Sequence, residues 1–241
     1  MYEIKDIGGH ILEQYYDVLR KCVLFRGVEE NKFRNLLYCL DGQVKKYHEE
    51  EYIFFAGDKV SHVGVVLSGR IEILKENLAG NKHIIAVLDP SNMFAEGIVC
   101  TASRLSPVTS QAMEDAEVLL IPYERIIKSC GAACDFHISL IQNMMVILGE
   151  KNVSLNWKLE LLTLKGMREK LASYLLNASK ENGSNTFLIP LNRTELADFL
   201  NVSRTSMCRE LTRMKDDGLI DLYGRSFKIL DSERLAECLE T

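Results

Sequence analysis

The spacing of apolar residues changes twice along the chain. Between residues 10 and 40 they recur at helical intervals, and a break at Arg26-Gly27 predicts separate short helices. From Gly42 to about Pro122 they gather instead into short β-branched runs separated by glycines and an Asp-Pro pair, as strands are separated by turns. The runs are Ile53–Phe55, Val63–Leu67, Ile71–Leu74, Ile84–Leu88 and Val118–Ile121. Many short strands with regular turns are typical of a β-sandwich or barrel.

Helical spacing returns after Pro122, and a long helix is predicted from about Cys134 to Leu164. Apolar residues along it step by alternating threes and fours, which is the heptad pattern of a two-stranded coiled coil. The predicted seam consists of Ile138, Ile141, Met145, Leu148, Asn152, Leu155, Leu159 and Leu162. A single polar residue in a seam, here Asn152, can fix the register of a dimer. The alternative is a helix packed on its own domain, but its largely polar other faces favour a homodimer. Gly166 follows as a predicted hinge.

Two short helices joined by a tight turn are predicted further along the chain. Asn192 and Glu195 have the spacing of a capping box, so a helix should begin there and end before Asn201-Val202. A second helix should run from Ser203 to Lys215, with Met207, Leu211 and Met214 on one face. Packing of that apolar face leaves the opposite face free for a partner.

The distribution of charge indicates that the partner of this second helix is nucleic acid. The chain has a net charge of −5, so its surface as a whole does not attract nucleic acid, yet cations gather between residues 203 and 215. Arginine can pair with guanine in the major groove, and the N-terminal end of a recognition helix reaches the bases. The predicted DNA contacts are Ser203, Arg204, Thr205, Ser206, Cys208, Arg209, Thr212 and Arg213. A hairpin turning near Gly224-Arg225 would add a wing. The alternative is an ordinary three-helix unit with solvated arginines.

The order of these features resembles the cyclic-AMP receptor protein/FNR (CRP/FNR) family of bacterial transcription regulators. Residues 201–211, Asn-Val-Ser-Arg-Thr-Ser-Met-Cys-Arg-Glu-Leu, followed by Asp-Gly-Leu-Ile at 217–220, look like the family's recognition helix. The resemblance implies an α+β fold with a cyclic-nucleotide-binding-like β-roll (a double-stranded β-helix), a long dimerisation helix and a winged helix-turn-helix, at residues 1–133, 134–165 and 166–241. It also makes Arg204 and Arg209 base- or phosphate-contacting residues. Thr205 stands where the family often has a glutamate that reads cytosine, so the half-site sequence should differ.

In the β-roll the resemblance rests on Phe54–Gly57, Val66–Gly69, Gly80 and Asn92–Gly97. A cyclic nucleotide needs an arginine to pair with its phosphate, but the family's Arg-Ser pair falls on Ser106-Pro107, and Arg104 is only a weak substitute. We therefore expect a small effector other than cyclic AMP. The resemblance places it near Glu96, Gly97, Arg104, Ser106, Thr109, Asn152 and Asn156.

The cysteines and histidines of the chain bear on redox and metal chemistry. Seven cysteines, at positions 22, 39, 100, 130, 134, 208 and 238, contain no Cys-x-x-Cys pair, so neither a disulfide framework nor an iron–sulfur cluster is expected. Cys130 and Cys134 lack the further ligands of a zinc site, and no metal site is predicted. Haem stays open as an alternative, which would make the protein a gas (NO/CO) or redox sensor of the same fold. Its candidate axial ligands are His62, His83, Cys100, Met144 and Met145.

An enzyme is not expected. A metal-dependent cupin needs a His-x-His pair, whereas His48, His62 and His83 are isolated, and no nucleophile or acid–base pair is evident.

At 47% hydrophobic and 26% charged residues the composition is that of a globular protein. No apolar run approaches the roughly 20 residues of a membrane span, and no signal peptide is evident. We expect a cytoplasmic protein whose partners are a palindromic double-stranded promoter site, a second copy of the chain and RNA polymerase, without a membrane.

Overall fold

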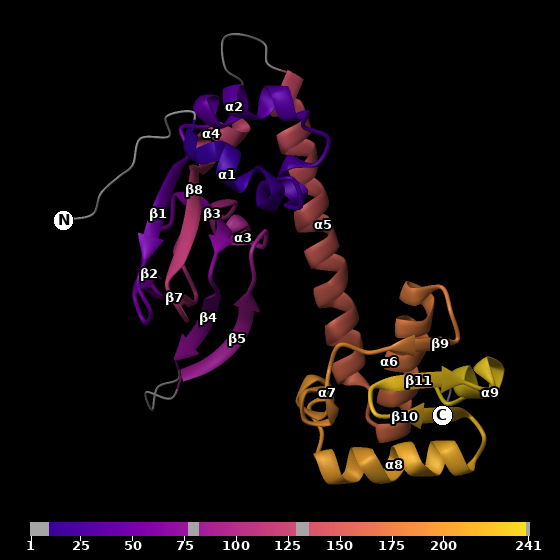
Figure 1. Ribbon diagram of the computed structural model, residues 1–241. Coiled ribbons are helices and arrows are strands. Elements are labelled where there is room, and N and C mark those ends of the chain that lie inside the picture. Colours follow the sequence, from indigo (N-terminus) through magenta and orange to yellow (C-terminus); the bar gives the residue numbers. More distant parts are fainter. Residues whose placement is uncertain (1–9, 77–81, 129–134, 240–241) are drawn as a thin grey trace. The chain divides into compact units, whose positions relative to one another are not determined.

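The structure is a computed structural model that describes residues 10–76, 82–128 and 135–239 (Figure 1). It divides into two compact units, Met1–Glu150 and Lys151–Thr241. The division falls within the long helix α5 (Asp135–Thr163), which contributes residues to both units. Gly80, Cys130 and Cys134, which entered the predictions, lie outside the described residues.

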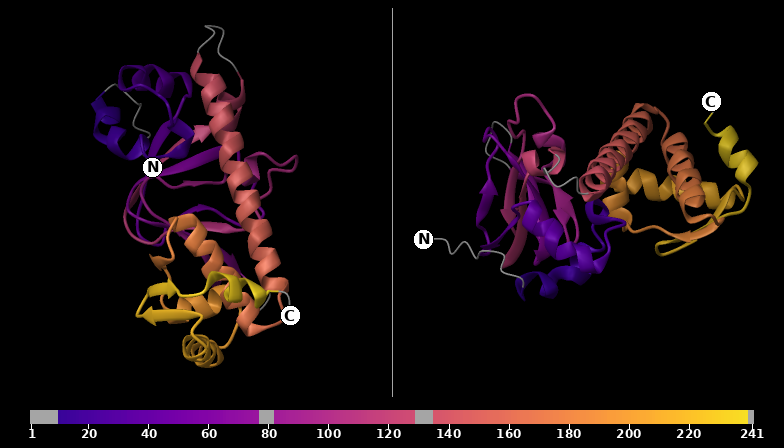
Figure 2. Two further views of the ribbon diagram at one scale, coloured as in Figure 1. Left: turned by 90° about the vertical axis from the view of Figure 1, so that its right-hand side faces the viewer. Right: turned by 90° about the horizontal axis from the view of Figure 1, so that it is seen from above.

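The first unit contains two antiparallel four-stranded sheets, with strand orders β1-β8-β3-β6 and β2-β7-β4-β5. Both contribute to one core, in which Val63 and Val118 come from the first sheet and Ile71 and Ala112 from the second. Figure 2 shows this unit from two further sides. The strands are β1 (Gln43–Tyr47), β2 (Tyr52–Phe54), β3 (His62–Ser68), β4 (Ile71–Glu76), β5 (Lys82–Leu88), β6 (Met93–Phe94), β7 (Thr109–Ala112) and β8 (Ala116–Pro122). This arrangement confirms the predicted β-roll.

Each of the five apolar runs coincides with a strand, but three strands were not predicted. β1 contains two lysines, β6 is only two residues long, and β7 has the polar sequence Thr-Ser-Gln-Ala. β7 nevertheless lies between β2 and β4 and pairs with both. Its position inside a sheet therefore depends on pairing between distant segments, which no local apolar pattern reveals.

Helical segments cover part of this unit. They are α1 (His10–Leu19), the 3₁₀ turn η1 (Val23–Phe25), α2 (Glu30–Cys39), α3 (Glu96–Val99) and α4 (Tyr123–Ile127). Tyr15 of α1 donates a hydrogen bond to Glu117 of β8, whose carboxylate also binds Lys46 at 2.6 Å and accepts from Ser68 at 3.3 Å. Glu117 thus ties α1 to the first sheet. Gly69 turns the chain from β3 to β4 at φ +70°, where a Cβ atom would lie 2.4 Å from the Asp115 carbonyl oxygen.

Helix α5 packs one face on the core of the first unit. Leu140, Met144 and Ile147 are buried there. Four predicted seam residues, Ile138, Met145, Leu155 and Leu159, are instead 63%, 68%, 64% and 61% exposed. Ile141, Leu148 and Leu162 are half-buried, and Asn152 is exposed. The helix therefore has both an inward-packing face, which the heptad analysis did not identify, and a largely uncovered predicted seam.

The second unit is a small helical domain with one three-stranded sheet of order β10-β11-β9. Its core includes Leu161 of α5, Leu175 of α6, Leu196 of α7 and Phe227 of β11. Its other elements are α6 (Met167–Asn182), β9 (Thr186–Leu188), α7 (Arg193–Leu200), α8 (Arg204–Asp216), β10 (Ile220–Tyr223), β11 (Ser226–Ile229) and α9 (Ser232–Glu237). This arrangement confirms the predicted winged helix-turn-helix.

Candidate nucleic-acid interface and sensor site

Helices α7 and α8 form the predicted helix-turn-helix. The Asn192 side chain accepts hydrogen bonds from the backbone of Thr194 and Glu195, and Glu195 accepts from the Asn192 backbone, so the capping box is present. Asn201 ends α7 in the left-handed conformation at φ +52°, which asparagine tolerates. Ser203 is the N-cap of α8 as predicted, but its side chain makes no capping hydrogen bond. The Ser203 hydroxyl is therefore not committed to that cap.

Two lysines stabilise the carboxyl end of α7. The last carbonyls of a helix have no partner within the helix, and the helix dipole makes that end attractive to cations. Lys170, which is buried, donates to the Leu200 carbonyl at 3.2 Å, and Lys158 donates to the Phe199 carbonyl. Lys158 also lies 3.0 Å from the centroid of the Phe199 ring. These contacts fix the end of α7 from which the turn leads to α8.

Helix α8 presents two different faces. Met207, Leu211 and Met214 are buried in the core of the second unit, as predicted. Figure 1 shows α8 at the edge of this unit, with α7 and the sheet on its other side. The predicted contacts other than Cys208, which is half-buried, are exposed: Ser203, Arg204, Thr205, Ser206, Arg209, Thr212 and Arg213. These seven side chains therefore lie on the accessible face of α8.

The arginines of α8 differ in their partners. Arg213 lies 3.4 Å from Glu210. Within the part of the chain that the structure describes, no ion pair is formed by Arg204 or Arg209. Lys215, in the last turn, is paired with Asp221 at 2.7 Å. Arg204 and Arg209 are therefore the cations of α8 that remain available to an anionic ligand.

Two carboxylates of the α8 region have a further partner outside the helix-turn-helix. Arg168 of α6 binds Glu210 at 2.6 Å and Asp217 at 2.8 Å, so it reaches two carboxylates of the α8 region. The hydrogen bond to Glu210 raises the pKa of the Arg168 guanidinium. Arg168 could not be identified from the sequence, because its partners lie more than 40 residues away and no local motif marks the contact. Glu210, the one acidic residue between positions 203 and 215, was the available clue in the sequence.

The wing follows α8. β10 and β11 are joined through Gly224-Arg225, as predicted, and Gly224 has φ +56°. Arg193 of α7 donates to the Gly224 carbonyl at 2.8 Å and stacks over the Phe227 ring at 4.7 Å. Arg225 donates to the Pro190 carbonyl at 3.2 Å, and Tyr223 is 89% exposed. The wing is thus held against the helix-turn-helix.

The predicted effector residues divide between the units. Asn152 and Asn156 are exposed and belong to the second. In the first, Glu96 is buried at the start of α3, Gly97 is exposed, and Thr109 accepts from the Ala56 backbone at 3.1 Å. The buried Ser106 hydroxyl donates to the Val108 carbonyl at 2.6 Å.

Arg104, the nearest substitute for the family's phosphate-binding arginine, already has a partner. Its Nη2 atom lies 2.7 Å from Glu124, and its guanidinium stacks over the Tyr123 ring at 5.2 Å. The hydrogen bond from Arg104 lowers the pKa of Glu124, with a further contribution from Lys128. Binding of a phosphate by Arg104 would therefore compete with this carboxylate.

The candidate haem ligands lie on different elements. His62 begins β3, His83 is exposed on β5, and Cys100 is exposed after α3. Burial lowers the pKa of His62 below its ordinary value, and Lys45 adds to this effect. Met144 is packed in the core, whereas Met145 is exposed on α5. In the described ranges no three histidine, cysteine or acidic residues are grouped to hold a metal ion.

Among the described helices, none has the length and apolarity to cross a membrane.

Comparison with known proteins finds a family model that matches each of the two units. The model of the cyclic nucleotide-binding domain matches residues 44–131, and that of the Crp-like helix-turn-helix domain matches residues 169–238. The chain is 28% identical over 187 residues to the transcriptional activator protein FnrA of Stutzerimonas stutzeri, which covers 76% of this chain and 74% of that protein. It is 25% identical over 225 residues to the CRP-like cAMP-activated global transcriptional regulator of Mycobacterium tuberculosis, covering 91% and 97%.

Solved structures share the fold. The catabolite activator protein of Thermus thermophilus has a TM-score of 0.52 at 22% identity, covering 90% of this chain and 98% of that one. A CooA mutant from Carboxydothermus hydrogenoformans has a TM-score of 0.55 at 20% identity, covering 83% and 88%. The relatives named above are regulators, which agrees with the expectation that this chain is not an enzyme. The chain belongs to the CRP/FNR family and is a DNA-binding transcription regulator with an effector-binding domain.

Proposed function

We propose that the protein acts as a homodimer that binds an inverted-repeat promoter site and responds to a small effector other than cyclic AMP. The observation that carries the DNA-binding part is the state of Arg204 and Arg209, which are exposed on α8 without an ion pair among the described residues. An unpaired guanidinium can form two parallel hydrogen bonds with guanine N7 and O6. Arg204 and Arg209 would read bases or bind phosphates, with the other predicted α8 residues beside them.

Exposure along α5 supports the homodimer. Four apolar seam residues are each more than 60% exposed, as expected for positions that meet a partner helix rather than the core. A second copy of α5 would cover them in a coiled coil, with Asn152 fixing the register. Two α8 helices would then contact half-sites separated by about one helical turn of DNA, 34–36 Å. RNA polymerase is the further partner we expect for such a regulator.

The environment of Arg104 supports an effector other than cyclic AMP. The relative from M. tuberculosis is named for activation by cAMP. In this chain Ser106 stands at the expected phosphate position, and the substitute Arg104 is bound to Glu124. A phosphate that enters without a free cation loses several kcal/mol of favourable interaction, which weakens binding by about 100-fold or more. An effector without a phosphate fits Glu96, Gly97, Ser106 and Thr109 better. Haem remains an alternative proposal.

Selection of binding sites from random duplex DNA tests the proposal directly. We expect the full-length protein to enrich an inverted repeat and to bind it about 1,000-fold or more tightly than unrelated DNA at physiological salt. One half-site alone should bind much more weakly, because it engages one recognition helix. Enrichment of no sequence, in the presence and absence of cell extract as a source of effector, would contradict the proposal.

A further inference from the structure

A hollow of about 500 Å³ lies on the sheet β2-β7-β4-β5. Glu72 and Leu74 of β4 line it from the sheet face opposite the core, and Ala112 of the core also borders it. Ile73 of β4 packs against the core, whereas its neighbours Glu72 and Leu74 line the hollow, as the alternation of a strand requires. None of the lining residues belongs to the predicted effector site. The hollow is therefore distinct from the site in which the effector is expected.

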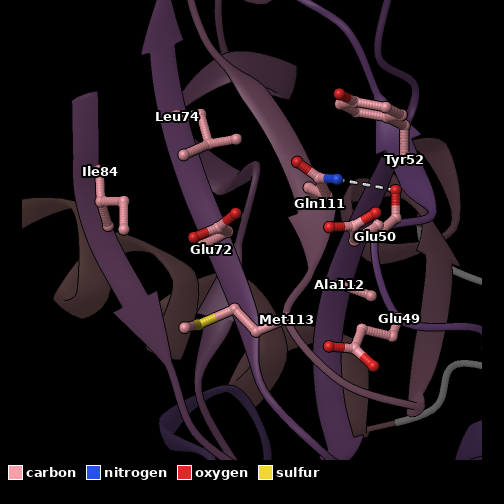
Figure 3. Close-up of a pocket in the computed structure, with 9 residues that line it drawn as sticks. All are labelled: Glu49, Glu50, Tyr52, Glu72, Leu74, Ile84, Gln111, Ala112 and Met113. Carbon is pink, nitrogen blue, oxygen red and sulfur yellow. Dashed lines mark hydrogen bonds between the residues drawn. The ribbon is translucent and has the colours of Figure 1, made fainter. Parts of the chain in front are cut away.

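One part of the hollow is apolar. Leu74 is almost fully buried although it does not belong to the core of the unit, and Ile84 of β5 lies beside it with 57% of its surface exposed. Met113 contributes a flexible side chain that adapts to different ligand shapes. Figure 3 shows these three side chains along β4, β5 and the end of β7. They can cover the hydrocarbon body of a ligand.

The other part is acidic. Glu49 and Glu50 come from the turn before β2, and Glu72 comes from β4. The turn is tied to β7, because Glu50 donates its backbone N–H to Ala112 at 2.9 Å and Ala112 donates to Glu51 at 2.9 Å. Within the described ranges, none of the three hollow-lining carboxylates has a lysine, arginine or histidine within ion-pair distance. The three negative charges thus have no described counter-ion.

Gln111 of β7 points to the kind of ligand. The residue is 7% exposed, and its Nε2 atom donates to the Glu50 carbonyl at 2.7 Å. Because the nitrogen must face that carbonyl, the amide oxygen is directed into the hollow (Figure 3). That oxygen has no hydrogen-bond partner among the described residues. A donor group of a ligand in the hollow would form a hydrogen bond with this oxygen in place of water.

The polar groups that we have described here, carboxylates and an amide oxygen, accept hydrogen bonds and favour positive charge. A metal ion does not fit, because no group of three acidic, histidine or cysteine residues in the described ranges has the arrangement to hold one. We propose that this hollow is a binding site for an organic cation with an apolar body, of the class of aryl-alkyl amines. The ammonium would lie between Glu72, Glu50 and Gln111, and the apolar body against Leu74, Ile84 and Met113.

Calorimetry of the full-length protein with four probes near neutral pH tests this assignment. Phenethylamine carries both required features, phenethyl alcohol lacks the charge, phenylacetate reverses it, and spermidine has charge without the aromatic body. We expect phenethylamine to bind at least about tenfold more tightly than each of the other probes. Equal binding of the alcohol and the amine, or no binding of the amine at millimolar concentration, would overturn the proposal.

A pair of variants localises the binding. Glu72→Gln keeps the shape of the side chain and should weaken phenethylamine binding by about tenfold, because one charge-assisted hydrogen bond is lost. Glu76→Gln changes the same strand by the same charge but does not line the hollow, so it should leave the affinity unchanged. Thermal melting verifies that both variants are folded. If the two variants behave alike, the amine binds elsewhere and the proposal is wrong. DNA binding plays no part in this test, so its result is independent of the proposed regulatory function.

Discussion

The two units differ in which of their arginines are bound by carboxylates. In the first unit, Glu124 binds Arg104, which is the candidate cation of the sensor site. In the second unit, Glu210 and Asp217 bind Arg168 of α6, and Glu210 also lies 3.4 Å from Arg213 of α8. Arg204 and Arg209 are left without ion pairs among the described residues. An arginine is therefore available to an anionic ligand only when no nearby carboxylate binds it.

Disruption of the dimer should lower DNA affinity by the largest factor, because the α8 arginines of two copies are proposed to act together. Leu155→Lys with Leu159→Lys places two charges in the predicted seam and should give monomers in sedimentation. Affinity for the selected inverted repeat should fall by about 1,000-fold, toward that for unrelated DNA.

Val153→Lys is the matched control for the seam variant. Val153 is 69% exposed on the same helix, but it lies about 200° around the axis from Leu155. It should leave both the sedimentation and the DNA affinity unchanged. Dimers that persist in the seam variant would place the interface elsewhere.

Removal of Arg168 should have the next largest effect, on both the stability of the second unit and its DNA affinity. Arg168→Ala leaves the Glu210 side chain, which is 12% exposed, without its closest cation, and should lower the free energy of unfolding of the second unit by about 1–2 kcal/mol. Arg213 would remain beside Glu210 and be held more firmly, so DNA affinity should fall although Arg168 does not belong to the predicted DNA contacts.

Denaturant unfolding and DNA titration of Arg168→Ala and Arg168→Lys provide the measurement. Lysine keeps the charge but cannot bind two carboxylates with one planar fork, so it should restore only part of the loss. Wild-type behaviour of the alanine variant in both assays would show that Arg168 does not position α8.

A smaller effect is expected for Glu117, which binds Lys46 in the first unit as Glu124 binds Arg104. Burial raises the pKa of Glu117, but hydrogen bonds from Lys46, Tyr15 and Ser68 outweigh burial and bring the pKa below its ordinary value. A carboxylate with a lowered folded pKa stabilises the fold above its unfolded pKa, near 4.5, and this contribution is lost as pH falls through the folded pKa.

Thermal melting as a function of pH measures this contribution. The wild type should lose melting temperature as pH falls below about 4.5, and Glu117→Gln should lose less over the same window while melting lower at neutral pH. Identical pH profiles for the two proteins would show that the contacts of Glu117 add no stability.

The smallest expected effect concerns Arg104. Calorimetry with cyclic AMP should detect no micromolar binding to the wild type, and Arg104→Ala should not change this result, because Glu124 already occupies the guanidinium. Micromolar binding that disappears in Arg104→Ala would identify Arg104 as a phosphate partner and would remove the contrast between the two units.

The helix-turn-helix could be predicted residue by residue because its signals are local. The capping box of Asn192 and Glu195 and the inward face of Met207, Leu211 and Met214 each depend on residues a few positions apart. One helix then determines which side chains share the exposed face. For this reason seven of the eight predicted DNA contacts proved to be exposed, although their role in binding stays a prediction.

The sensor unit was less predictable because its contacts join distant segments. The pairing of Arg104 with Glu124 spans 20 residues, and the hydrogen bond from Gln111 to Glu50 spans 61. The polar strand β7 becomes part of a sheet only through its two neighbours. Apolar periodicity detects the faces of regular elements, but it does not report which distant polar groups will meet.

The most direct test of the account compares Arg209→Ala with Arg213→Ala on the selected inverted repeat and on random duplex DNA at several salt concentrations. Arg209 is unpaired among the described residues, so its removal should cost about 1–3 kcal/mol on the selected site and relax the preference at one base pair. Arg213 already lies 3.4 Å from Glu210, so its removal should weaken both kinds of DNA slightly and to a similar extent. Equal losses for the two variants on both DNAs would contradict the roles assigned to the arginines of α8.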